Sequence, residues 1–160
     1  MDDEVTAYHE CGHAIIAIIS GARVKQLTLE PEWDDGPARY GDARVEWRVS
    51  NYSARELRLR KAQTALAGPV AEMVYTGDPF HPAFVAEWQS DWDIASSELQ
   101  PLQPDPQRLM RMLEQVTREL HQLMSNEPVW PAIAALADEL LAHETLDEAQ
   151  IRAAADFWLS

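Results

Sequence analysis

The sequence predicts a mainly α-helical domain with a small antiparallel β-hairpin. Apolar residues recur at helical spacing over most of the chain, and only two short runs near its start alternate as strands do. A length of 160 residues is enough for one domain with a substantial core and too short for two comfortable ones. No internal repeat or low-complexity stretch divides the chain. We therefore expect a single domain over residues 1–160.

The first third of the chain is expected to hold one helix and the hairpin. Residues 1–20 carry a broad apolar surface at helical spacing, and Gly21 is a suitable stop. Residues 24–49 contain the two alternating runs, and the Asp and Gly residues between them, at 34–36, are typical of a turn. These features predict two antiparallel strands joined by a long loop.

The rest of the chain is expected to be helical. A Ser-x-x-Glu capping box at residues 53–56 opens a helix over residues 53–76. Glycine and prolines then favour a loop over residues 77–88. Residues 90–160 form the helical remainder, because leucines and other apolar residues keep helical spacing there. A cap at residues 145–148 is expected to open the last short helix.

Composition and charge exclude several classes of protein. A formal net charge of −14 repels nucleic acid and anionic membrane surfaces. The longest clean apolar run, residues 14–19, falls far short of the ~20 residues that span a bilayer. The acidic start differs from the basic start of a signal peptide, and the single cysteine, Cys11, excludes an intrachain disulfide. We expect a cytoplasmic protein that neither inserts into a membrane nor binds nucleic acid.

The most informative motif is the H-E-x-x-H sequence that begins at His9 and ends at His13. Residues four apart lie on nearly the same face of a helix, so both imidazoles can bind one metal ion, and zinc suits them. Glu10 lies beside them, where a general base acting on metal-bound water belongs. Cys11 points about 200° away from His9 and is expected in the core. The alternative is an ordinary amphipathic helix whose histidines fall one turn apart by chance.

Four segments, in order, resemble the FtsH-type peptidase family, the proteolytic domain of membrane-anchored AAA proteases. Residues 7–14 resemble its zinc-binding helix, with Cys11 where the family usually has alanine. Residues 66–77 resemble its Gly-x-x-Ala-Glu helix, residues 90–96 the segment with the third metal ligand, and residues 136–147 a C-terminal Leu-Leu-x-x-Glu-Thr-Leu-Asp stretch. The resemblance implies the helical fold of that peptidase domain. The sequence lacks the family's phosphate-binding loop, so ATP-driven unfolding does not carry over.

The resemblance implies that an aspartate completes the metal site. Asp91 is the expected third ligand, and Asp93 takes that place if the register slips by two. The Asp91 register is favoured because Ala95 and Ser96 then follow at the family's spacing. The alternative is that both aspartates only complement the dipole of a helix that starts here.

Other polar and aromatic residues have less certain roles. Glu72 lies among apolar residues and is expected either to orient His9 or His13 through the free ring nitrogen or to be a surface charge. Three tryptophans in or beside irregular segments are candidates for a substrate cleft, although a structural role is favoured for each: Trp33, Trp88 and Trp92.

These observations predict a zinc metalloendopeptidase that is independent of ATP as an isolated chain. His9, His13 and Asp91 hold Zn²⁺, and Glu10 acts as the general base in hydrolysis of a peptide or unfolded protein substrate. We expect an extended substrate to pair with a free strand edge at residues 24–30.

The main alternative is a catalytically silent, peptidase-like binding or regulatory module. A closed structural zinc site would then need a fourth ligand, with His81 and Asp93 as the nearest candidates. A deformylase-like hydrolase fits less well, because deformylases take a cysteine as third ligand and the only cysteine here lies inside the motif. The family's peptidase domains form hexameric rings, so the resemblance leaves a homo-oligomer open.

Overall fold

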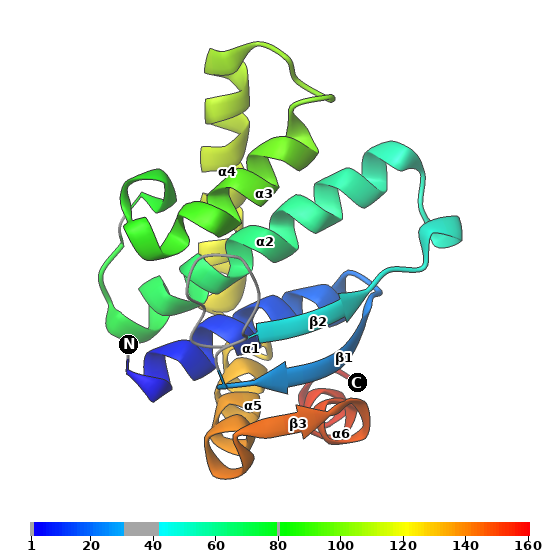
Figure 1. The fold of residues 1–160 in the computed structure, drawn as a ribbon, viewed down its shortest axis with the longest axis vertical. Helices are drawn as coiled ribbons and strands as arrows, with labels where there is room; N and C mark the ends of the chain where they lie inside the picture. Colours follow the sequence, from blue (N-terminus) through cyan, green and yellow to red (C-terminus); the bar gives the residue numbers. More distant parts are fainter. Residues whose placement is uncertain (1, 31–41, 80) are drawn as a thin grey trace.

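The computed structural model describes residues 2–30, 42–79 and 81–160 (Figure 1). The turn expected at residues 34–36 and Trp33 lie outside the described residues. The prediction of a mainly helical fold with a small antiparallel sheet is confirmed. Its helices are α1 (Asp3–Ile19), α2 (Ala54–Thr76), α3 (Gln89–Leu99), α4 (Pro106–Met124), α5 (Val129–His143) and α6 (Glu148–Leu159). Its strands are β1 (Arg23–Thr28), β2 (Asp42–Glu46) and β3 (Thr145–Asp147).

The sheet has three strands in the order β2-β1-β3, and both pairings are antiparallel. β3 was not expected, because three residues are too few to show an alternating pattern. It pairs with β1 from Gln26 to Thr28, and the N–H of Leu29 donates to the carbonyl of Glu144. β1 is therefore the central strand, and the prediction of a free edge at residues 24–30 is wrong. β2 and β3 form the two sides of the sheet (Figure 1).

Helix α1 lies at the centre of the molecule, between α2 and α5, and it also contacts β1 (Figure 1). One of its faces is fully buried and includes Ala7, Cys11 and Ile15. Cys11 is thus a core side chain, as expected. Gly12 allows the closest approach to α2, because a Cβ there would lie 2.5 Å from the Cβ of Ala71 and 2.6 Å from the carbonyl oxygen of Ala67. The two helices therefore meet backbone to backbone beside the histidines.

The ends of α2 follow the expected chemistry. The Ser53 side chain accepts from the N–H of Glu56, and Gly77 ends the helix with a left-handed φ of 79°. Pro69 lies inside the helix, where it leaves the carbonyl of Ala65 without its usual donor. The stretch expected as a loop, residues 77–88, contains two short 3-10 helices, η2 (Pro82–Phe84) and η3 (Ala86–Trp88). A third 3-10 helix, η1, covers Val49–Asn51.

In the C-terminal part, α4 packs against α2, whereas α5 and α6 contact α1 and lie below it in Figure 1. Helices α4 and α5 bury leucines and other apolar residues at the expected spacing. Helix α6 begins with a capping box, in which Asp147 and Gln150 each accept from the other's backbone N–H. Among the described residues, no helix combines the length and the apolar character needed to cross a membrane.

Candidate metal centre

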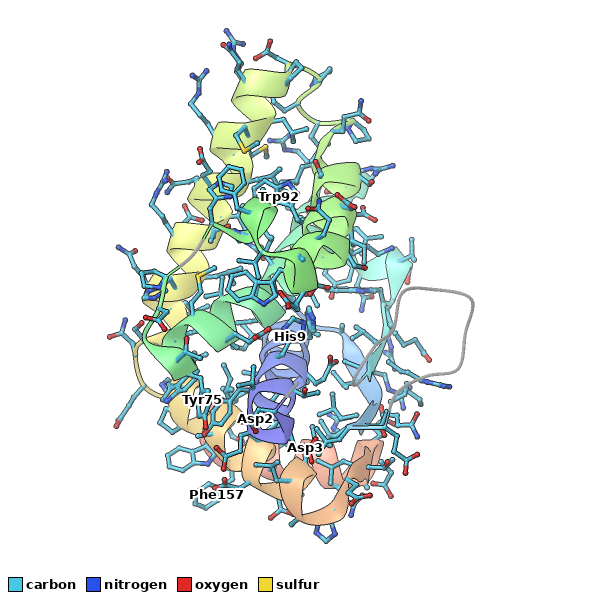
Figure 2. All side chains as sticks on the ribbon, turned by 60° about the vertical axis from the view of Figure 1, so that its left-hand side comes forward. Asp2, Asp3, His9, Tyr75, Trp92 and Phe157 are labelled. Atoms are coloured by element: carbon cyan, nitrogen blue, oxygen red, sulfur yellow. The ribbon has the colours of Figure 1, made fainter. Side chains whose placement is uncertain are left out.

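Three side chains from two separate helices converge between α1, α2 and α3. His9 and His13 project from consecutive turns of α1, and Asp91 lies in the first turn of α3. Figure 2 shows the labelled His9 on the side of α1 that faces α2 and α3. Of the two aspartates considered, the structure places Asp91 beside the histidines, whereas Asp93 is exposed and accepts from the Gln89 amide at 2.9 Å.

The three donor atoms form a small triangle. The Nε2 atoms of His9 and His13 lie 3.1 Å apart, and Asp91 Oδ2 lies 2.9 Å from the first and 3.4 Å from the second. A tetrahedral zinc ion with bonds of about 2.0–2.1 Å separates its donors by about 3.3–3.4 Å. The triangle therefore matches one face of such a tetrahedron to within about half an ångström. These three residues can hold a metal ion.

The other nitrogen of each imidazole determines where its lone pair lies. His9 Nδ1 lies 2.5 Å from Glu72 Oε2, and His13 Nδ1 lies 2.7 Å from the backbone carbonyl oxygen of Thr64. Both oxygens are acceptors, so each Nδ1 carries a proton, and a neutral ring presents its lone pair at Nε2. Two lone pairs and a carboxylate oxygen then face one another within 3.4 Å. Such an arrangement needs a cation between them, or protons in its place.

The pKa values of the ligands reflect this excess of acceptors. Burial alone lowers the pKa of His9, but hydrogen bonds to Asp91 and Glu72 outweigh it and raise the pKa well above its usual value. The pKa of His13 is raised in the same way, with Asp91 overcoming burial. Burial raises the pKa of Asp91, but the charges and hydrogen bonds of His13 and His9 hold it well below its usual range. The pocket thus favours positive charge.

Glu10 is buried at the same place, with 8% of its surface exposed. Its negative charge contributes to raising the pKa of both His9 and His13, which places the carboxylate within electrostatic reach of their rings. Glu10 directly follows His9 on α1, and it is not one of the three donor residues.

Glu72 lies in the middle of α2 and is 7% exposed, and its Oε2 accepts from two donors. One is His9 Nδ1, and the other is the indole N–H of Trp88 at 2.6 Å. Of the two expected roles, the geometry supports the orienting one, and it selects His9 rather than His13. Hydrogen-bonded partners of this kind fix the tautomer and ring plane of a ligating histidine.

Gly68 keeps the metal pocket open. A Cβ at this position would lie 2.4 Å from His13 Nε2 and 2.6 Å from His9 Nε2. A side chain there would occupy the space between the two ligand atoms. The absence of a side chain at residue 68 is thus a requirement of the site as well as of the α1–α2 packing.

Sequence reasoning missed three contributors to the site. The Thr64 carbonyl is a backbone group, so no residue type signals it. Gly68 stands inside the matched Gly-x-x-Ala-Glu segment, but spacing alone did not indicate contact with the histidines. Trp88 is 5% exposed, which agrees with the structural role favoured for it over a substrate cleft, but the sequence did not indicate its hydrogen bond to Glu72. Trp92 is also buried, at 6% exposed, which agrees with the structural role favoured for it.

His81 belongs to a different cluster. Its Nε2 lies 3.1 Å from Glu114 Oε2 on α4, and its Nδ1 accepts from the N–H of Ala83. Both ring nitrogens are therefore engaged away from the metal centre. Among the described residues, the ligand group contains three members, and neither His81 nor Asp93 adds a fourth.

The three side chains of the candidate centre are not completely buried. The side chains of His9 and His13 are each 13% exposed, and that of Asp91 is 17% exposed. An ion bound by the three donors can thus accept a further ligand from solvent, as catalytic zinc sites do.

In comparisons with known proteins, no family model matches the chain, and no curated protein matches it either.

Proposed function

We propose that this chain is a zinc-dependent metallopeptidase of the H-E-x-x-H plus aspartate type. The observation that carries the proposal is the triangle of His9 Nε2, His13 Nε2 and Asp91 Oδ2, with edges of 2.9, 3.1 and 3.4 Å. The four ordered segments that resemble the FtsH-type peptidase domain support the same conclusion. The chain would hydrolyse peptide bonds in peptides or unfolded proteins.

Zinc is the metal that the donor set fits best. Two neutral imidazoles, one carboxylate and one open position are typical of catalytic zinc sites, whereas magnesium and calcium prefer all-oxygen sites. When bound, zinc would act as a Lewis acid that lowers the pKa of water toward ~7 and stabilises negative charge on the peptide carbonyl oxygen.

The protein's own residues would supply the remaining chemistry. Glu72 and the Thr64 carbonyl hold both imidazoles with their Nε2 lone pairs turned inward. The Glu10 carboxylate would take the proton of the attacking water and deliver it to the leaving amine. The burial of Glu10 and its place directly after His9 on α1 support this role.

An extended substrate that pairs with the sheet would have to use an outer strand, β2 or β3, rather than β1. β1 has β2 on one side and β3 on the other, so its backbone groups from Gln26 to Thr28 are already paired. Pairing of a peptide with an outer strand would fix its direction through main-chain hydrogen bonds.

The rival function, a silent binding module with a structural zinc, is less favoured. A closed structural site takes four protein ligands. The described residues offer three, and the two candidates for a fourth, His81 and Asp93, have other partners. A structural site would also give the buried Glu10 no role.

The first test is the zinc content per chain, measured by elemental analysis on protein purified without chelators or a His-tag. We expect about one zinc in the wild type and its loss in Asp91→Ala. Asp93→Ala is the matched control, because Asp93 lies on the same helix and bonds only Gln89 among the described residues. A wild type without zinc, even after zinc is added back, would contradict the proposal.

The second test separates hydrolysis from metal binding. Glu10→Gln should retain zinc but lose cleavage of an unfolded protein substrate, because an amide cannot accept the proton. If the variant cleaves as fast as the wild type, Glu10 is not the base. If the zinc-loaded wild type cleaves no unfolded substrate, the silent module is the better description.

A further inference from the structure

Trp88 is a buried side chain that the proposed chemistry does not use. It lies between α2 and the start of α3, the helix that carries Asp91. It ends η3 and directly precedes α3, which carries Asp91 three residues later. Its ring belongs to the hydrophobic core, and its indole N–H leaves that core to reach Glu72.

One oxygen atom connects the three helices of the metal centre. Glu72 Oε2, on α2, accepts from His9 Nδ1 on α1 at 2.5 Å and from Trp88 Nε1 at the start of α3 at 2.6 Å. Hydrogen bonds to a carboxylate are among the stronger ones and are correspondingly short. The orientation of His9 and the placement of the segment before Asp91 are therefore coupled through this oxygen.

We propose that Trp88 is a positioning residue of the metal centre, which holds the Glu72 carboxylate, and through it His9 and the start of α3, in the geometry that binds the ion. The inference rests on the metal site of the proposed function and not on peptide hydrolysis. Trp88 does not touch the metal or a substrate in this role.

Two physical reasons support the role. A carboxylate as buried as Glu72 is costly unless donors satisfy it, and Trp88 supplies one of the two that the structure gives. Trp88 is also the N-cap residue of α3, and it makes no side-chain capping bond to that helix. Its indole bond to Glu72 thus fixes the beginning of α3 against α2. Outer-shell partners of metal ligands typically change metal affinity by about 10- to 100-fold.

The experiment is a zinc titration of the full chain against a chromophoric chelator, with Trp88→Phe as the first variant. Phenylalanine keeps an aromatic ring in the core and removes the N–H donor. We expect zinc binding about 10-fold weaker or more. The matched control is Trp92→Phe, which is equally buried and has an indole N–H without a hydrogen bond in the described part of the chain. The control should change the affinity by less than about threefold.

A second genetic background, with Glu72 substituted, distinguishes a positioning role of Trp88 from a role in core packing. In Glu72→Leu the oxygen that accepts from Trp88 is absent, so adding Trp88→Phe should weaken zinc binding further by less than about threefold. A role confined to core packing would weaken binding by the same factor in both backgrounds. The thermal midpoint of each metal-free protein checks that every variant folds.

The outcomes separate this inference from the proposed function. If the wild type binds zinc and Trp88→Phe binds it equally well, the inference is overturned and the metal site stands. Equal losses in the wild-type and Glu72→Leu backgrounds also overturn it. A wild type that binds no zinc overturns both.

Discussion

The two histidines and the aspartate of the metal centre are held in different ways. His9 and His13 belong to the central helix α1, whose backbone is packed closely against α2 at Gly12. Asp91 belongs to the short helix α3, which follows two 3-10 helices and is tied to α2 through the Trp88 side chain. Close packing on α2 fixes the backbone of the histidine half, and hydrogen bonds to Glu72 and the Thr64 carbonyl orient its rings. The aspartate half depends on specific side-chain contacts across helices.

This difference indicates which parts of the candidate site should tolerate substitution. Close backbone packing leaves no room for adjustment, so even a methyl group added there should abolish binding. A side-chain hydrogen bond can be removed without unfolding the protein, and its loss should lower the affinity for zinc without abolishing binding. The predictions below test the two halves in that order.

The largest effect is expected at Gly68. In Gly68→Ala the new Cβ would lie 2.4 Å from His13 Nε2 and 2.6 Å from His9 Nε2, so both rings must move away from the metal position. We expect zinc binding to fall by at least about 100-fold, since loss of ligand geometry exceeds the effect of an outer-shell partner. A zinc titration measures the loss.

Gly77→Ala provides the control for Gly68→Ala. Gly77 has a φ of 79° and no neighbour within 4 Å of an added Cβ, so alanine there strains the backbone and blocks nothing. It should cost about 1–2 kcal/mol of stability and leave zinc affinity unchanged. If Gly68→Ala binds zinc as tightly as Gly77→Ala does, the histidine rings do not need the space that Gly68 leaves.

An intermediate test asks whether core packing, rather than the Trp88 bond, holds the aspartate half. Leu99 ends α3 and is fully buried, and alanine there should leave a cavity that costs about 2–5 kcal/mol of unfolding free energy. Because the bond from Trp88 to Glu72 remains, we expect zinc affinity to change by less than about threefold. Chemical denaturation measures the stability, and a zinc titration of the folded variant measures the affinity. A large loss of affinity would mean that packing along α3 positions Asp91.

The same contrast decides how much could be predicted from the sequence. The spacing of His9 and His13 is a local property of one helix, so the motif alone predicts their common face and the position of Glu10 beside them. The prediction of Asp91 rests on a resemblance and not on spacing, because 77 residues of chain separate it from His13. Its selection over Asp93 relied on the two residues that follow.

What could not be predicted depends on tertiary contacts. The Thr64 carbonyl and the Cβ-free position at Gly68 act through backbone geometry, which residue identity does not reveal. Trp88 reaches Glu72 only because residues 81–88 fold back as two 3-10 helices. Strand β3 is three residues long and exists because β1 offers it a partner. Its presence changes the edge that a substrate can use.

The smallest effect is expected at the far end of the histidine half, where Glu4 of α1 meets Tyr75 of α2. The Tyr75 hydroxyl donates to Glu4 Oε2 at 2.5 Å, and this hydrogen bond, with a smaller effect of burial, raises the pKa of Tyr75 from 10.0 to about 12. Because the folded-state pKa lies above the unfolded one, the contact stabilises the fold below pH ~10 and this contribution is lost as the pH rises through ~12. In Glu4→Gln, one tyrosine should titrate closer to 10.

A tyrosinate absorbance titration of the wild type and Glu4→Gln measures this shift. Asp3→Asn is the matched control, because Asp3 lies in the same first turn of α1 and is not among the groups that raise the pKa of Tyr75. Zinc affinity should stay within about twofold in both variants, since the packing at Gly12 and Gly68 fixes α1 independently of its exposed end. If Glu4→Gln weakens zinc binding tenfold, the placement of α1 depends on side-chain contacts at its exposed end as well, and the contrast between the two halves fails.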